Sequence, residues 1–139
     1  PSPYIDHGVC PFECCTYRNW QAKRKVGLFD RPDGKRIGEL EKGEWVKGLT
    51  GETHSIPLRV VASREVPEAG IHPGDAFYVL HYEGEFYSKI WYKGKLFDAE
   101  SSDPRSPKTQ WWAKVKRKNG SVGWVRADGG AFGNQDQCG

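Results

Sequence analysis

The chain has 139 residues, of which 37% are hydrophobic and 13% aromatic, so it can fold as one domain or as two small ones. It has few long apolar runs, which argues against a segment that spans a membrane. The formal net charge is only +3, with both signs interspersed. This mild basicity points only weakly to nucleic acid or anionic surfaces and mainly indicates solubility. We expect no nucleic-acid partner and no membrane insertion.

The chain order of apolar residues predicts short β-strands rather than helices. No segment of 11 or more residues has apolar positions at i, i+3, i+4 and i+7. Strand-like runs are instead separated by turns that contain Gly or Pro. The expected strands lie at residues 25–30, 35–40, 45–50, 57–63, 76–82, 86–92, 110–117 and 121–127. The segments 65–75 and 98–108 are expected to be connecting loops. This spacing predicts an all-β barrel or sandwich.

The hairpin expected over residues 76–92 gathers aromatic side chains on one face. If Gly84 and Glu85 are the central turn residues, the opposed pairs are Tyr78–Trp91, Leu80–Lys89 and Tyr82–Tyr87. The other face carries Phe77, Val79, His81, Ile90 and Tyr92, and its aliphatic residues mark it as the core face. The aromatic face is then either a ligand groove or a surface that packs on another part of the chain.

The dipeptide Asn119-Gly120 is the strongest hairpin signal in the sequence. As a two-residue turn it pairs Val115 with Trp124 and Lys114 with Val125. The side chains of Lys114, Lys116 and Lys118 then share one face. That face is either a contact for an anionic polymer or an ordinary solvated strand surface.

Two segments resemble parts of bacterial SH3-like domains. "VGLFDRPDGKRIGELEKGEWVKGLT" (26–50) resembles their opening, with an x-P-x-G turn followed by x-I-G-x-L-x-K-G, and "KNGSVGWVRADG" (118–129) resembles their closing hairpin. The resemblance implies either two SH3-like barrels in tandem or one elaborated barrel. We favour the tandem arrangement, with an N-terminal segment and first barrel at 1–66 and a second barrel with a C-terminal tail at 67–139.

Members of that family are usually non-catalytic recognition modules of exported proteins that meet the cell envelope. The resemblance therefore implies a binding module for a cell-envelope polymer or peptide, with aromatic contacts. The candidate ligand-binding residues are Tyr78, Tyr82, Tyr87, Trp91 and Trp111. "GLFDR" (27–31) also resembles the A-L-Y-D-Y strand of eukaryotic Src-homology-3 domains. Arg31 replaces the second Tyr of their proline-binding groove, so that strand does not imply binding of proline-rich peptides.

The cysteines allow three kinds of site. Cys10, Cys14 and Cys15 lie close together, and Cys138 is near the other end of the chain. With His7 the cluster forms a conceivable zinc or copper ligand set, but it lacks a C-x2-C knuckle, and adjacent cysteines rarely face one ion. A cell-wall hydrolase would need a Cys at the start of a helix with a His base, and no convincing helix follows Cys10 or Cys14. We therefore expect no enzyme, no metal and no cofactor, with the hydrolase and the metal-binding envelope protein as alternatives.

Two disulfides fit the four cysteines best in a turn-rich β-protein. A vicinal Cys14–Cys15 bond is the least favoured pairing because it is strained, and the other two pairings stay open. Each complete pairing sends one bond from the cluster to Cys138, so the N- and C-terminal segments are expected to lie side by side. The disulfides in turn predict an oxidising location, periplasmic or extracellular. We also expect a monomer.

Overall fold

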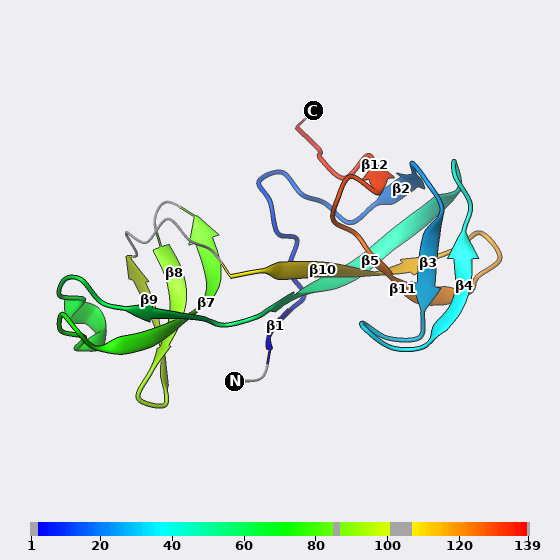
Figure 1. Ribbon diagram of the computed structural model, residues 1–139. Coiled ribbons are helices and arrows are strands. Elements are labelled where there is room, and N and C mark those ends of the chain that lie inside the picture. The colour runs from blue at the N-terminus through cyan, green and yellow to red at the C-terminus, as the bar shows by residue number, and fades with distance from the viewer. Residues whose placement is uncertain (1–2, 85–86, 101–106, 139) are drawn as a thin grey trace. The chain divides into compact units, whose positions relative to one another are not determined.

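The chain is all-β in the computed structural model, which describes residues 3–84, 87–100 and 107–138 (Figure 1). The strands are β1 (Tyr4–His7), β2 (Asn19–Ala22), β3 (Val26–Phe29), β4 (Arg36–Leu40), β5 (Trp45–Ser55), β6 (Leu58–Val61), β7 (Ala76–Gly84), β8 (Tyr87–Tyr92), β9 (Lys95–Glu100), β10 (Thr109–Lys116), β11 (Val122–Arg126) and β12 (Phe132–Gly133). In the described ranges the helical structure is a single 3-10 turn, η1 (Pro67–Ala69). No described helix has the length and apolar character needed to cross a bilayer. The all-β prediction is confirmed.

The strands form two sheets that belong to two units of the chain. The larger sheet has the order β12-β2-β5-β10-β11-β3-β4, with β1 paired to β5, and the smaller has the order β6-β7-β8-β9. The inserted unit comprises Ser55–Thr109 with Pro1–Tyr4, and the split unit comprises Ile5–His54 with Gln110–Gly139. This nested division differs from the tandem boundary expected between residues 66 and 67. Its physical reason is that β10 and β11 pair with β5 and β3, so the C-terminal strands complete the sheet that the N-terminal strands begin.

The chain enters and leaves the inserted unit through adjacent residues. The hydroxyl oxygens of Ser55 and Thr109 are 3.0 Å apart, and the Ile56 N–H donates to the Lys108 carbonyl at 3.0 Å. Both segments that resemble SH3-like domains, 26–50 and 118–129, lie in the split unit. The two motifs therefore belong to the same sheet rather than to successive halves of the chain.

The sheet of the split unit curls into a half-barrel around an aromatic core. Trp20 is fully buried and its ring centroid lies 5.6 Å from that of Trp111. The Trp111 Nε1–H donates to the Tyr17 hydroxyl at 2.9 Å, and that hydroxyl donates to the Val9 carbonyl. The remaining core residues are Ala22, Val26, Leu28, Leu40, Val46, Ala113, Val115, Val125, Ala127, Ala131 and Phe132.

The hairpin at Asn119-Gly120 forms, but its expected register is wrong by one residue. Lys114 pairs with Trp124, and Val115 pairs with Gly123. The loop is longer than expected because the Arg117 N–H donates to the Ser121 carbonyl at 2.8 Å, while Gly120 takes the left-handed conformation at φ +88°. A type I turn closed by a left-handed Gly is the next common hairpin loop after the two-residue turn.

Two disulfides form, Cys10–Cys15 and Cys14–Cys138, and none of the cysteines is free. The expected bond between the N-terminal cluster and Cys138 is therefore confirmed. Of the two pairings that the sequence left open, the structure has the one that joins Cys14 to Cys138. The terminal segments lie side by side, since the Thr16 N–H donates to the Gln135 carbonyl at 2.9 Å and the Gln137 N–H donates to the Cys14 carbonyl at 3.0 Å.

The inserted unit packs the inner face of its four-stranded sheet into a small core. Val79 and Ile90 are 2% and 1% exposed, and Ile71 from the connection before β7 is fully buried. The other core residues are Val60, Ala62, Ala69, Phe77 and Ala99. The core face expected from Val79 and Ile90 is confirmed, which leaves the opposite face of the sheet to carry Tyr78 and Trp91.

Candidate functional site: an aromatic groove on the inserted unit

A row of cross-strand neighbours runs over the outer face of the four-stranded sheet. Leu96 on β9 pairs with Trp91 on β8, Trp91 pairs with Tyr78 on β7, and Tyr78 pairs with Arg59 on β6. The ring centroids of Tyr78 and Trp91 are 6.0 Å apart at an interplanar angle of 58°. Directly opposed residues of adjacent strands have side chains in contact range, so the pairing itself assembles this row.

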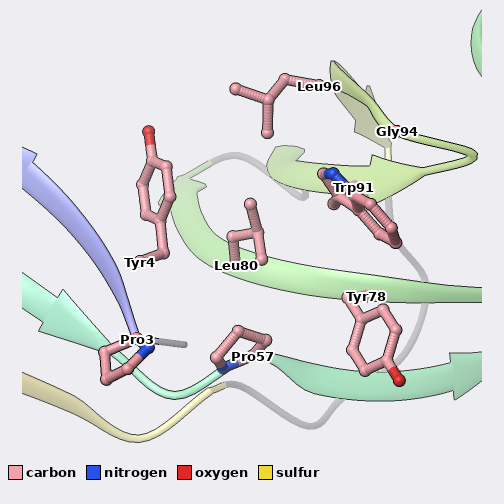
Figure 2. Close-up of a pocket in the computed structure, with 8 residues that line it drawn as sticks. All are labelled: Pro3, Tyr4, Pro57, Tyr78, Leu80, Trp91, Gly94 and Leu96. Carbon is pink, nitrogen blue, oxygen red and sulfur yellow. The ribbon is translucent and has the colours of Figure 1, made fainter. Parts of the chain in front are cut away.

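Leu96, Trp91 and Tyr78 of this row form part of a groove with a volume of about 510 Å³, within the range of ligand sites (Figure 2). Figure 2 shows eight residues around it, supplied by three strands of the sheet, the β8–β9 turn, the segment before β6 and the N-terminal segment. They are Pro3, Tyr4, Pro57, Tyr78, Leu80, Trp91, Gly94 and Leu96. None of these lining residues is charged, so the groove presents aromatic, aliphatic and proline surfaces.

The groove depends on a bulge in β7 at Leu80. Val79 pairs with Ile90, and His81 pairs with Lys89, so Leu80 is an extra residue with no direct partner. Leu80 is only 7% exposed although it lies on the outer side, because it fills the space between Tyr4 and the aromatic row (Figure 2). The expected Leu80–Lys89 pair is therefore wrong.

The β8–β9 turn holds Trp91 and Leu96 opposite each other. Tyr92 pairs with Lys95, so the loop has two residues, Lys93 and Gly94, with φ of +49° and +77°. Two positive φ angles identify a type I′ turn, whose twist matches that of the flanking strands. A Cβ on Gly94 would meet nothing within 4 Å, so Gly is required there by backbone conformation rather than by space.

The polar atoms of the aromatic row are available to a ligand. Neither the Tyr78 hydroxyl nor the Trp91 Nε1–H has a hydrogen-bond partner among the described residues. Trp91 is 43% exposed and Leu96 is 54% exposed. The groove therefore offers two hydrogen-bond donors beside a large open apolar surface.

The five residues expected to bind ligand are separated by the fold. Tyr78 and Trp91 pair as expected and line the groove. The expected Tyr82–Tyr87 pair is wrong: Tyr82 pairs with Ser88 and Tyr87 with Gly84, and both tyrosines are exposed outside the groove lining. The expected turn residue Glu85 lies outside the described residues. Trp111 is 5% exposed in the core of the split unit, where it is a packing residue.

Sequence reasoning missed most of the groove wall. Leu80 shares the predicted face with Tyr78 but is not among the candidate ligand-binding residues, and Pro3, Tyr4 and Pro57 lie outside the hairpin altogether. The only signal for these residues in the sequence is that both prolines stand beside aromatic or strand-forming residues. That signal places them at strand edges but does not say which sheet they approach.

The residues of the conceivable metal set have other partners. The Nδ1 of His7 is 2.8 Å from Oε2 of Glu52, whose Oε1 is 2.7 Å from Nε2 of His54. Among the described residues, the group with metal-binding spacing is Cys14, Asp136 and Cys138. Both of its sulfurs are joined in a disulfide, so this arrangement offers no thiolate ligand or nucleophile.

Comparisons of the chain with protein-family models, with curated proteins and with solved structures found no match.

Proposed function

We propose that this chain is a non-catalytic binding protein whose inserted unit holds an extended, proline-containing peptide in the groove. The observation that carries the proposal is the row of Tyr78, Trp91 and Leu96, which opens onto solvent with no charged side chain among the eight described lining residues. Aromatic grooves bind polyproline II segments because these segments are already extended and lose little entropy on binding.

The lining favours a peptide over a sugar polymer. A polyproline II segment has backbone carbonyls without internal partners, and the Tyr78 hydroxyl and Trp91 Nε1–H can donate to them. Orientation of a sugar in a binding site needs several convergent polar groups, and the eight described lining residues offer no carboxylate, amide or guanidinium.

The wider setting that we propose is an exported protein that acts as a monomer at the cell envelope. The two disulfides support a periplasmic or extracellular location, because such bonds persist in oxidising compartments. We propose an SH3-like barrel for the split unit. In its favour, the motifs at 26–50 and 118–129 contribute strands β3, β4, β5 and β11 of one sheet.

The proposal is tested by titrating a ten-residue peptide with two prolines in a P-x-x-P spacing against the wild type and against Trp91→Ala, with calorimetry as the readout. Loss of the indole removes a ring contact and a donor, so we expect binding at least about tenfold weaker. The matched control is Tyr87→Ala, since Tyr87 lies on the same strand and is 48% exposed, close to the 43% of Trp91, but lies outside the groove lining.

The control variant is expected to bind like the wild type. Equal losses of peptide affinity in Trp91→Ala and Tyr87→Ala would show that the groove is not the peptide-binding site. If the protein binds no proline-containing peptide but is retained on a neutral glycan matrix, the ligand of the groove is a sugar polymer and the peptide proposal is wrong.

A further inference from the structure

The split unit carries a second surface, on the outward side of β10 and β11. Side chains alternate along β10, so Trp111, Ala113 and Val115 enter the core while Lys114 and Lys116 point outward. On β11, Trp124 is paired with Lys114. We call this surface the basic face and define it by Lys47, Lys114, Lys116, Trp124 and Arg126.

Positive charge is concentrated on this unit and on this hairpin. The split unit has 14 basic and 10 acidic residues, whereas the inserted unit has 7 and 8. Residues 109–127 contain five basic residues and no acidic one. The basic residues of that segment are Lys114, Lys116, Arg117, Lys118 and Arg126.

Two of these cations are neutralised locally and others are not. Arg117 forms a bidentate pair with Glu44 at 2.8 and 2.9 Å, and Arg126 pairs with Asp128 at 2.8 Å. Lys114 and Lys116 have no ion pair with any residue that the structure describes, and neither has Lys47 on the neighbouring strand β5. The basic face therefore has a surplus of positive charge that is complementary to an anionic partner.

We propose that the basic face binds a linear anionic polysaccharide, a function separate from the peptide groove. Three lysines that project from adjacent strands suit charges repeated along a chain. Trp112, on the same side of β10 as Lys114 and Lys116, is only 4% exposed, with Phe29 at 5.4 Å and the Arg126 guanidinium at 5.7 Å from its ring, so it is not free to stack on a base. Single-stranded nucleic acid binds on a series of exposed rings that stack successive bases. Trp124, beside Lys114, is only partly exposed, so the lysines favour carboxylated or sulfated sugars.

The exposed Trp45 adds a flat apolar surface for a sugar ring. It is 42% exposed on β5, two residues from Lys47, and therefore points to the same side of the strand as that lysine. An apolar ring beside cations matches a polymer in which apolar sugar faces accompany acidic substituents.

The test uses the full chain, with heparin as the sulfated probe, polygalacturonate as the carboxylated probe and dextran as the neutral one. We expect binding to both anionic polymers, weakened by added salt, and none to dextran. Lys114→Gln combined with Lys116→Gln should weaken binding by about tenfold, since one exposed ionic contact contributes up to roughly fivefold. The control combines Lys23→Gln with Lys25→Gln, which removes the same charge from the same unit outside the basic face.

The proposal is supported if the control binds within about twofold of the wild type, given that a lost surface charge away from the contact has little effect. It is overturned by an equal loss in the two double variants, by wild-type binding to dextran alone, or by no binding at low salt. Tighter binding to an oligothymidylate than to either anionic sugar would also overturn it. Near-ultraviolet circular dichroism of the Tyr17, Trp20 and Trp111 cluster checks that every variant is folded.

Discussion

The role of each tryptophan depends on where its indole N–H is satisfied. In the split unit, the Trp20 N–H donates to the Thr16 carbonyl at 3.0 Å, and the Trp111 N–H donates to the Tyr17 hydroxyl. Burial raises the pKa of Tyr17, and the hydrogen bond from Trp111 acts in the opposite direction. The rings of Trp20 and Trp111 are buried in the core and their N–H groups are hydrogen-bonded there, whereas the Trp91 N–H is available to a ligand.

The pair of His72 and Glu65 on the inserted unit makes the stability of the protein depend on pH. The Nδ1 of His72 lies 2.8 Å from Oε2 of Glu65, and this hydrogen bond raises the pKa of His72. The contribution of the pair to stability is therefore complete below the ordinary His pKa of about 6.5 and is lost as the pH rises through the raised folded value. We expect Glu65→Gln to lower the pKa of His72, as measured by the NMR titration of its imidazole protons. An unchanged midpoint would contradict the assignment.

Asp75, beside His72, has the opposite pH dependence. The His72 backbone N–H donates to Oδ2 of Asp75 at 2.8 Å, the Tyr92 hydroxyl donates to the same atom at 3.0 Å, and both lower the pKa of Asp75. Its contribution is present above the ordinary Asp pKa and is lost as the pH falls through the lowered folded value. In an NMR titration that follows the carboxyl carbon of Asp75, Tyr92→Phe should raise the pKa of Asp75 toward its ordinary range, and a pKa that stays low would contradict the role of the hydroxyl.

At the level of elements, the sequence predicts the existence of hairpins better than their register. The Tyr78–Trp91 pair and the core face at Val79 and Ile90 follow from strict alternation, and both are confirmed. Alternation carries no information about an inserted residue, so the bulge at Leu80 and the longer loop after Arg117 each shift the pairing that follows. The groove is therefore only partly predictable: the face shared by Tyr78, Leu80 and Trp91 follows from alternation, while the loss of the Leu80–Lys89 pair comes from the bulge.

The β8–β9 turn is expected to control the stability of the groove hairpin. Gly94→Ala places a side chain at φ +77° and should lower the free energy of unfolding by about 1 kcal/mol. Lys93→Asn is the matched substitution at φ +49°, where Asn is better tolerated than Lys, and it should be neutral or slightly stabilising. Urea unfolding of the two variants measures both effects. If Lys93→Asn lowered the free energy of unfolding as much as Gly94→Ala does, the type I′ turn would be contradicted.

At the scale of the whole molecule, the nested chain order could not be predicted from local sequence patterns. The pairing of β10 with β5 and of β11 with β3 joins residues that are far apart in the chain, and no turn signal specifies these partners. Each half of the sequence contains enough strands for a small barrel, so a sequential division fits the local pattern equally well. The cysteines were more informative, because every complete pairing must join the N-terminal cluster to Cys138.

The two disulfides are expected to contribute unequally to stability. Cys14–Cys138 spans 124 positions and Cys10–Cys15 spans 5, and the entropy of closing a loop in the unfolded chain grows with its length. Replacing Cys14 and Cys138 by Ser should cost about 4–5 kcal/mol, against about 2 kcal/mol for Cys10 and Cys15. Urea unfolding of the two double variants compares them. Equal losses, or a larger loss for the short loop, would contradict the role of the long bond.

The most direct test of the peptide groove is an NMR titration of the tryptophan indole N–H signals with the P-x-x-P peptide. The sequence has six tryptophans, so each indole can be assigned by substitution. The Trp91 signal should shift with saturation, while those of Trp20 and Trp111, which donate within the split-unit core, should stay in place. A Trp91 signal that does not move at saturating peptide, or shifts confined to the other indoles, would contradict the account.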